Sequence, residues 1–93
     1  MKPVDWDKEK NEWLKRERGI SFEDILIAYK NKQVIAIIDH PNSKKYPNQK
    51  IYVVNIHEYA YLVPFVEDEE KVFLKTIFPS RKATKKYITG GKK

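Results

Sequence analysis

The segment "DKEKNEWLKRERGISFEDILIAY", residues 7–29, contains the signals that decide how the chain begins to fold. Its first half holds Asp7, a preferred helix N-cap residue, and Gly19, which readily takes the left-handed conformation found just beyond helix ends. These two positions predict a first helix over residues 8–18.

The second half of this segment predicts another helix directly after the first. Ser21 and Asp24 stand three residues apart, the spacing of a capping box, which predicts that the helix begins at Phe22. Ile20 and Ile25 occupy the positions of a hydrophobic staple around this start. The helix has an apolar stripe at helical spacing that we expect to be buried, made of Phe22, Ile25, Leu26 and Tyr29.

Beyond the helices, β-branched and aromatic stretches alternate with polar turns. They predict four strands, over residues 33–39, 50–56, 58–67 and 71–78, that form an antiparallel meander. Pro64 lies within the third strand, and because proline lacks an N–H group it predicts a bulge or an edge position there. The order of elements predicts an α+β fold with two N-terminal helices packed on one face of a four-stranded antiparallel sheet, and the other face open to a ligand.

The segment "PSRKATKKY", residues 79–87, is basic and one-sided. Pro79 and Ser80 predict the end of the last strand and the cap of a short helix, on which Ala83 and Tyr87 face inward. The net charge of +6 resides in residues 79–93, which hold six Lys or Arg and no acidic residue, whereas the preceding residues hold 13 of each sign. Charge concentrated on one element favours an anionic partner, nucleic acid first, although a solvated basic tail is the alternative.

The composition sets wider limits. Ninety-three residues, 41% of them hydrophobic, predict one globular domain over residues 1–89, with residues 90–93 as a flexible tail. The absence of cysteine excludes disulfides, thiol catalysis and cysteine-based zinc sites, and favours the cytoplasm. Two histidines predict no metal centre, no motif predicts a cofactor, and no apolar run suits export or a membrane span.

Three motifs, "WDKEK" followed by "RGISFED" near the start and "IFPSRKAT" near the end, resemble the BrnT-type toxins of type II toxin–antitoxin systems. The matching residues are Trp6, Asp7, Lys10, Gly19, Ile20, Ser21, Phe22, Glu23, Arg81, Lys82, Ala83 and Thr84. The resemblance implies a RelE-like fold, a ribonuclease activity that halts translation, and neutralisation by a DNA-binding antitoxin, often a ribbon-helix-helix protein encoded beside the toxin. The chain departs from the family pattern at Leu14 and Arg18, where the family often has Asn and His.

A metal-independent ribonuclease needs a proton acceptor for the ribose 2′-OH, a proton donor for the leaving 5′-oxygen, and cations for the developing charge. We expect Arg81 to clamp phosphate, because its planar fork matches two phosphate oxygens, with Lys82 as a second cation. The candidates for proton transfer are His57, Glu58 and Tyr87, with a lysine such as Lys75 as a further one, although ordinary surface roles are the alternative for the first two.

The candidate RNA-binding residues are Lys10, Arg18, Lys75, Arg81, Lys82, Lys85 and Lys86. For Lys10 and Arg18, pairing with acidic residues along the first helix is the alternative. We therefore expect a cytoplasmic toxin that cleaves RNA, with a noncatalytic RNA-binding module or a protein-targeting toxin of the same fold as the alternative.

Overall fold

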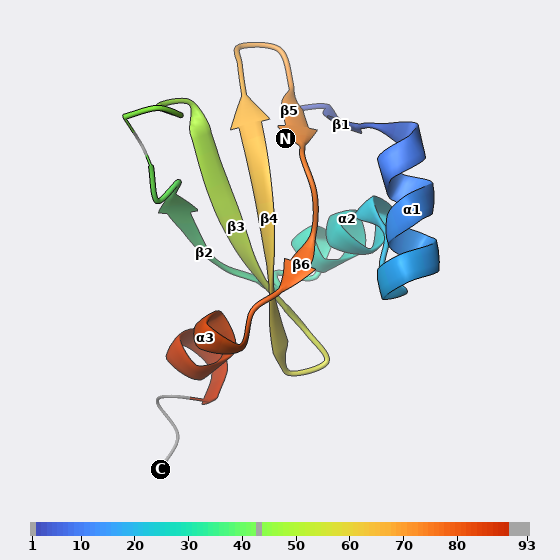
Figure 1. Ribbon diagram of the computed structural model, residues 1–93, viewed down its shortest axis with the longest axis vertical. Coiled ribbons are helices and arrows are strands. Elements are labelled where there is room, and N and C mark those ends of the chain that lie inside the picture. The colour runs from blue at the N-terminus through green and yellow to red at the C-terminus, as the bar shows by residue number, and fades with distance from the viewer. Residues whose placement is uncertain (1, 43, 90–93) are drawn as a thin grey trace.

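The computed structural model describes residues 2–42 and 44–89, so the expected tail, residues 90–93, lies outside the described part of the chain. The described residues form an α+β fold with a six-stranded mixed sheet (Figure 1). The elements in chain order are β1 (Val4–Trp6), α1 (Lys8–Arg18), α2 (Phe22–Lys30), β2 (Val34–Asp39), β3 (Gln49–Ile56), β4 (Tyr59–Glu67), β5 (Val72–Leu74), β6 (Phe78–Pro79), α3 (Arg81–Ala83) and a π-helical turn, η1 (Thr84–Thr89).

Helix α1 begins and ends where its capping residues predict. The Asp7 carboxylate accepts hydrogen bonds from the backbone N–H groups of Glu9, at 2.8 Å, and Lys10, at 3.3 Å. Gly19 follows the last helical residue with a φ of 64°, a conformation that costs a residue without a Cβ atom little. Both predicted caps are confirmed.

Helix α2 begins with the predicted capping box. The Ser21 hydroxyl accepts from the Asp24 N–H at 3.2 Å, and the Asp24 carboxylate accepts from the Ser21 N–H at 2.9 Å. The predicted apolar stripe is wrong at its end, because Tyr29 is 43% exposed and Ala28 is 3% exposed. The small Ala28 side chain fills the buried position, while the larger Tyr29 ring packs edge-on against Tyr52 with centroids 6.4 Å apart.

The sheet has the strand order β1-β5-β4-β3-β2, and β6 also pairs with β4. Strands β2 to β5 are antiparallel neighbours in chain order, which confirms the meander. Strand β1, which was not expected, pairs in parallel with β5, from Val4 opposite Val72 to Trp6 opposite Leu74. The expectation of four purely antiparallel strands is therefore wrong, because a three-residue strand carries too little pattern to be recognised in the sequence.

The fourth expected strand is divided into β5 and β6. Residues Val72, Leu74 and Ile77 are all buried, but the step from Leu74 to Ile77 breaks the two-residue period of a strand. The backbone leaves the ladder between β5 and β6, and the Ile77 side chain is fully buried in the core. The single strand expected over residues 71–78 is therefore wrong.

Pro64 lies in an interior strand and causes no bulge against β3. The pairing of β3 with β4 runs without a register shift, from Gln49 opposite Val66 to Ile56 opposite Tyr59. On the other side of β4, β5 pairs with residues 65–67 and β6 with residues 61–62, so Pro64 lies between the two pairings. Its carbonyl accepts from the Lys75 N–H at 2.8 Å on that side. The missing N–H group therefore falls in the gap between β5 and β6, and no ladder bond to β3 is lost.

The core consists of two apolar clusters separated by the sheet. The first cluster joins α1 and α2 to β3, β4 and β5, and its buried members are Leu14, Ile20, Phe22, Ile25, Ala28, Val54, Val63, Phe65, Val72, Leu74 and Ile77. The second consists of Val53, Ala60, Ala83 and Ile88, with half-buried neighbours that include Tyr87. Successive side chains of β3, Val53 and Val54, belong to different clusters because side chains alternate across a strand. The second face is thus partly covered by the C-terminal helical segment, and the expectation of an open face is wrong there (Figure 1).

Asn11 connects α1 to the first turn of α2. It is 3% exposed, its amide nitrogen donates to a Glu23 carboxylate oxygen at 2.8 Å, and its amide oxygen accepts from the Phe22 N–H at 2.8 Å. The Asn11 hydrogen bond is the main cause that lowers the pKa of Glu23. Phe22 is fully buried, so Asn11 satisfies a backbone donor that lies away from solvent.

We expect Asn11→Ala to lower the free energy of unfolding by about 1–3 kcal/mol, because the buried Phe22 N–H would lose its acceptor. Urea denaturation followed by circular dichroism measures this change. The matched control is Glu17→Ala on the exposed side of the same helix, which should change stability by less than about 0.5 kcal/mol. Equal effects of the two substitutions would contradict a connecting role for Asn11.

Candidate nucleic-acid interface

The C-terminal helical segment, Arg81–Thr89, presents its cations to solvent. The Ser80 hydroxyl accepts from the Ala83 N–H at 3.0 Å, which confirms Ser80 as the cap. Ala83 and Ile88 are buried at 8% and 9% exposure. The exposed basic residues are Arg81, Lys82, Lys85 and Lys86. The segment is therefore amphipathic, with an apolar side on the sheet and a basic side in water, and we call this basic side the basic surface.

Two hydrogen bonds hold this segment against the start of β4, and a third orients the threonine that makes one of them. The Ser80 N–H donates to the Ala60 carbonyl at 3.0 Å, and the Ala60 N–H donates to the Thr84 hydroxyl oxygen at 2.8 Å. The Thr84 hydroxyl in turn donates to the Ser80 carbonyl at 2.7 Å. Thr84 is 7% exposed, so its hydroxyl is an interior link between the basic segment and the sheet. Sequence reasoning missed this role, although a threonine beside the buried Ala83 was a usable signal.

His57 and Glu58 form the two-residue turn between β3 and β4. Their φ angles are 54° and 65°, as in the type I′ turns that suit the twist of antiparallel strands. The Asn55 side-chain oxygen accepts from the Glu58 N–H at 3.0 Å and closes the turn. Because Ala60 follows Glu58 by two residues, the turn lies close along the chain to the point where the basic segment is held.

His57 and Tyr87, two of the candidates for proton transfer, do not share one pocket. His57 lines a hollow of about 360 Å³ together with Asp24 of α2 and with Ile56 and Tyr61, which pack on the first core cluster. Tyr87 is half-buried against the second cluster, where the Lys86 ammonium lies 5.3 Å from its ring centroid. His57 and Tyr87 therefore belong to opposite faces of the sheet.

Two of the expected RNA-binding cations have structural contacts on α1. The Lys10 ammonium lies 4.4 Å from the ring centroid of Trp13, and the Arg18 guanidinium carbon lies 5.0 Å from it. The Arg18 guanidinium also donates to the carbonyl of Ile77. Arg18 therefore joins the end of α1 to the connection between β5 and β6. Lys75 lies on the same connection, where its side chain is exposed.

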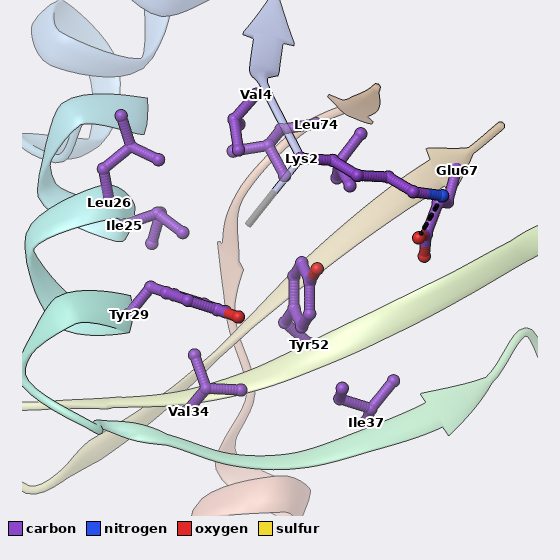
Figure 2. A pocket seen from close by; sticks show the side chains of 11 residues that line it. Lys2, Val4, Ile25, Leu26, Tyr29, Val34, Ile37, Tyr52, Glu67 and Leu74 are labelled. Atoms are coloured by element: carbon purple, nitrogen blue, oxygen red, sulfur yellow. Dashed lines mark ion pairs between the residues drawn. The ribbon is translucent and has the colours of Figure 1, made fainter. Parts of the chain in front are cut away.

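A separate apolar hollow of about 260 Å³ lies between α2 and the sheet (Figure 2). Tyr52 forms part of its floor and stacks on Phe65, with ring centroids 4.0 Å apart, and burial raises the pKa of Tyr52. The Lys2 ammonium and the Glu67 carboxylate form an ion pair of 2.8 Å beside it. The lining residues are Lys2, Val4, Ile25, Leu26, Tyr29, Val34, Ile37, Tyr52, Glu67, Val72 and Leu74. None of the candidate residues named from the sequence lines this hollow.

Within residues 2–42 and 44–89, no three His, Cys, Asp or Glu side chains are grouped in a way that could hold a metal ion. The helices of this part of the chain are too short or too polar to cross a membrane. No family model, no curated protein and no solved structure matches the chain. The motif resemblance to the BrnT-type toxins therefore stays a prediction.

We expect Thr84→Val to loosen the basic segment without unfolding the sheet, because valine keeps the shape of threonine but cannot accept from the Ala60 N–H. Amide hydrogen exchange should become faster at Ala60 and along residues 81–89, while exchange at Val54 and Val63 stays slow. The matched control is Thr89→Val, at an exposed position of the same segment. Unchanged protection at Ala60 would show that the hydroxyl does not hold the segment.

Proposed function

We propose that the chain is the toxin of a type II toxin–antitoxin system, and that it binds RNA through the basic surface and cleaves it. The observation that carries the proposal is the set of four exposed cations on a segment fixed to the sheet by Ala60 and Thr84. A fixed array of cations contacts successive phosphates at a lower entropy cost than a mobile tail. The ordered motifs described above, with their resemblance to the BrnT-type toxins, support the same function.

Arg81 has the central role in the proposed reaction. It is the first residue of α3 and is exposed, so its guanidinium can donate two parallel hydrogen bonds to a phosphate group. In the proposed step the ribose 2′-oxygen attacks the adjacent phosphorus and the 5′-oxygen leaves, while Arg81 and Lys82 stabilise the negative charge that develops on the phosphate oxygens.

The proton transfers of this step are proposed for side chains near the point where the segment is held. Glu58 and His57 precede Ala60 by two and three residues, and Tyr87 lies on the basic segment itself. A carboxylate or imidazole suits the acceptance of the 2′-OH proton, and an imidazolium or phenol suits donation to the leaving oxygen. All three residues stay candidates in the proposal.

A noncatalytic RNA-binding module, or a protein-targeting toxin of the same fold, is the second candidate function. Two observations favour it. His57 and Tyr87 belong to opposite faces of the sheet, which separates two of the groups that proton transfer would need. Lys10 and Arg18 lie over the Trp13 ring, and Arg18 also donates to the Ile77 carbonyl, so these side chains are less available to reach RNA phosphates than the sequence suggests.

The proposal includes a cytoplasmic location and a cognate antitoxin, expected to be a ribbon-helix-helix protein with an acidic segment. The basic surface supports the acidic segment of this partner, because clustered positive charge favours a partner of opposite charge.

We expect Arg81→Ala to slow RNA cleavage by about 10²- to 10³-fold and to abolish growth inhibition when the chain is expressed alone, because one preorganised donor to the phosphate is lost. Arg16→Ala, which removes an exposed arginine from α1, is the matched control and should leave both properties unchanged. Circular dichroism checks that both variants are folded.

Binding of the same RNA, measured by fluorescence anisotropy at increasing salt, separates the two candidate functions. A wild-type chain that binds RNA with strong salt dependence but leaves it uncut would favour the noncatalytic module. Salt-independent binding, or a folded Arg81→Ala variant with full toxicity, would contradict the proposed role of the basic surface.

A further inference from the structure

The two edges of the sheet differ in how well they are protected. Strand β1 forms one edge and has three residues, preceded by Pro3. Its central residue, Asp5, is exposed and lies 3.6 Å from the Lys71 ammonium. A short strand that carries a charged residue is a poor template for pairing with another chain.

Strand β2 forms the other edge and lacks these features. It has six residues, Val34–Asp39, and within the described part of the chain it pairs with β3 alone. Five of the six are apolar, and two of them are large and exposed: Ile35 at 40% and Ile37 at 58%. An edge strand of this length and composition presents unpaired backbone groups and apolar side chains together, which favours the addition of another strand.

Apolar surface continues from this edge onto the neighbouring helix. Ile37 and Val34 lie on the same side of the sheet as Tyr29, which is 43% exposed (Figure 2). These three residues, with Lys30 and Lys32, line a shallow hollow beside the strand. A partner that extends the sheet would therefore also cover the Ile37 and Tyr29 side chains.

The charged residues at the two ends of β2 differ in sign. Lys30 and Lys32 precede the strand and form no ion pair with another residue of the described chain, and Asp39 ends it. The exposed Asp39 carboxylate lies 3.9 Å from the Lys50 ammonium, near the limit for an ion pair. When two identical strands pair in antiparallel fashion about Ile37, Asp39 of each copy lies opposite Ile35 of the other, so no like charges face each other along the strand. Lys32 then lies three residues beyond Ile35, on the same side of the axis as the partner copy's Asp39.

We propose that a second copy of this chain pairs with β2 in antiparallel fashion about a two-fold axis, which joins the two sheets into one. The register of β2 against β3 shifts between Val34 and Ala36, so the regular stretch is Ala36–Asp39. Residues directly opposite each other in an antiparallel pair share a face of the sheet. A two-fold axis at Ile37 places Ile37 of one copy directly opposite Ile37 of the other. The two exposed side chains then lie on the same face of the joined sheet and pack against each other.

This dimer goes beyond the proposed RNA function and does not depend on it. The basic surface is carried by residues 81–89, which pack in a cluster with Val53 and Ala60 and with Ala36 and Ile38 of β2. The Ile37 side chain lies on the opposite face of β2, because side chains alternate along a strand. The pairing at β2 therefore leaves the basic surface of each copy at its own place on the sheet.

An engineered cysteine tests the pairing directly, because the chain has no cysteine of its own. Residues opposite each other in antiparallel strands have Cα atoms about 4.5–5.5 Å apart, which lies within the range that a disulfide spans. We expect the purified Ile37→Cys variant to form a disulfide-linked dimer under mild oxidation. Ile27→Cys is the matched control: Ile27 has the same exposure, 58%, but lies on α2 and lines a different hollow. It should stay monomeric on a non-reducing gel.

Sedimentation velocity on the unmodified chain gives an independent readout. We expect a species of twice the chain mass that Ile37→Lys converts to a folded monomer, because the substitution places two like charges opposite each other across the axis. Cross-linking of Ile27→Cys as fast as Ile37→Cys, or a wild-type chain that is monomeric at every concentration, would overturn the dimer. Either result would leave the proposed RNA function untouched.

Discussion

The fold depends on the way one asparagine side chain joins two helices that are too short to be stable alone. Helices of 11 and nine residues gain little stability in isolation, so their packing must be fixed by contacts between them and with the sheet. Asn11 supplies a donor and an acceptor in a place that solvent does not reach, and both groups are used by the first turn of α2. With the turn angle set in this way, Leu14 and Phe22 reach one core together.

The features that could be predicted from sequence are those whose causes are local. The caps of α1 and α2 depend on residues within four positions, and their boundaries follow from Asp7, Gly19 and Ser21. The strand β1 could not be found, because it has only three residues and its partner β5 lies 68 positions further along the chain. The split of the last strand at Ile77 also depends on the space left between the helices and the sheet, which no window of sequence contains.

The candidate site follows the same rule. Exposure of Arg81 and Lys82 could be predicted, because a capped helix with an apolar side must turn its charged side to water. The contact of Arg18 could not be predicted, since the Ile77 carbonyl that accepts from it comes from another part of the chain. Burial of Thr84 had a signal in its position beside Ala83, but its partner could not be predicted, because the Ala60 N–H is a backbone group with no signature in the sequence.

The parallel pairing of β1 with β5 has a consequence for how the molecule forms during synthesis. Val4 leaves the ribosome 68 residues before its partner Val72. Contacts between such distant positions form late and slow the search for the native state, because the intervening chain must first be ordered. The hairpin of β3 and β4 can form early from neighbouring residues, whereas the sheet is completed only after β5 and β6 have been made, and until then the edge of β4 that they cover is open to wrong partners.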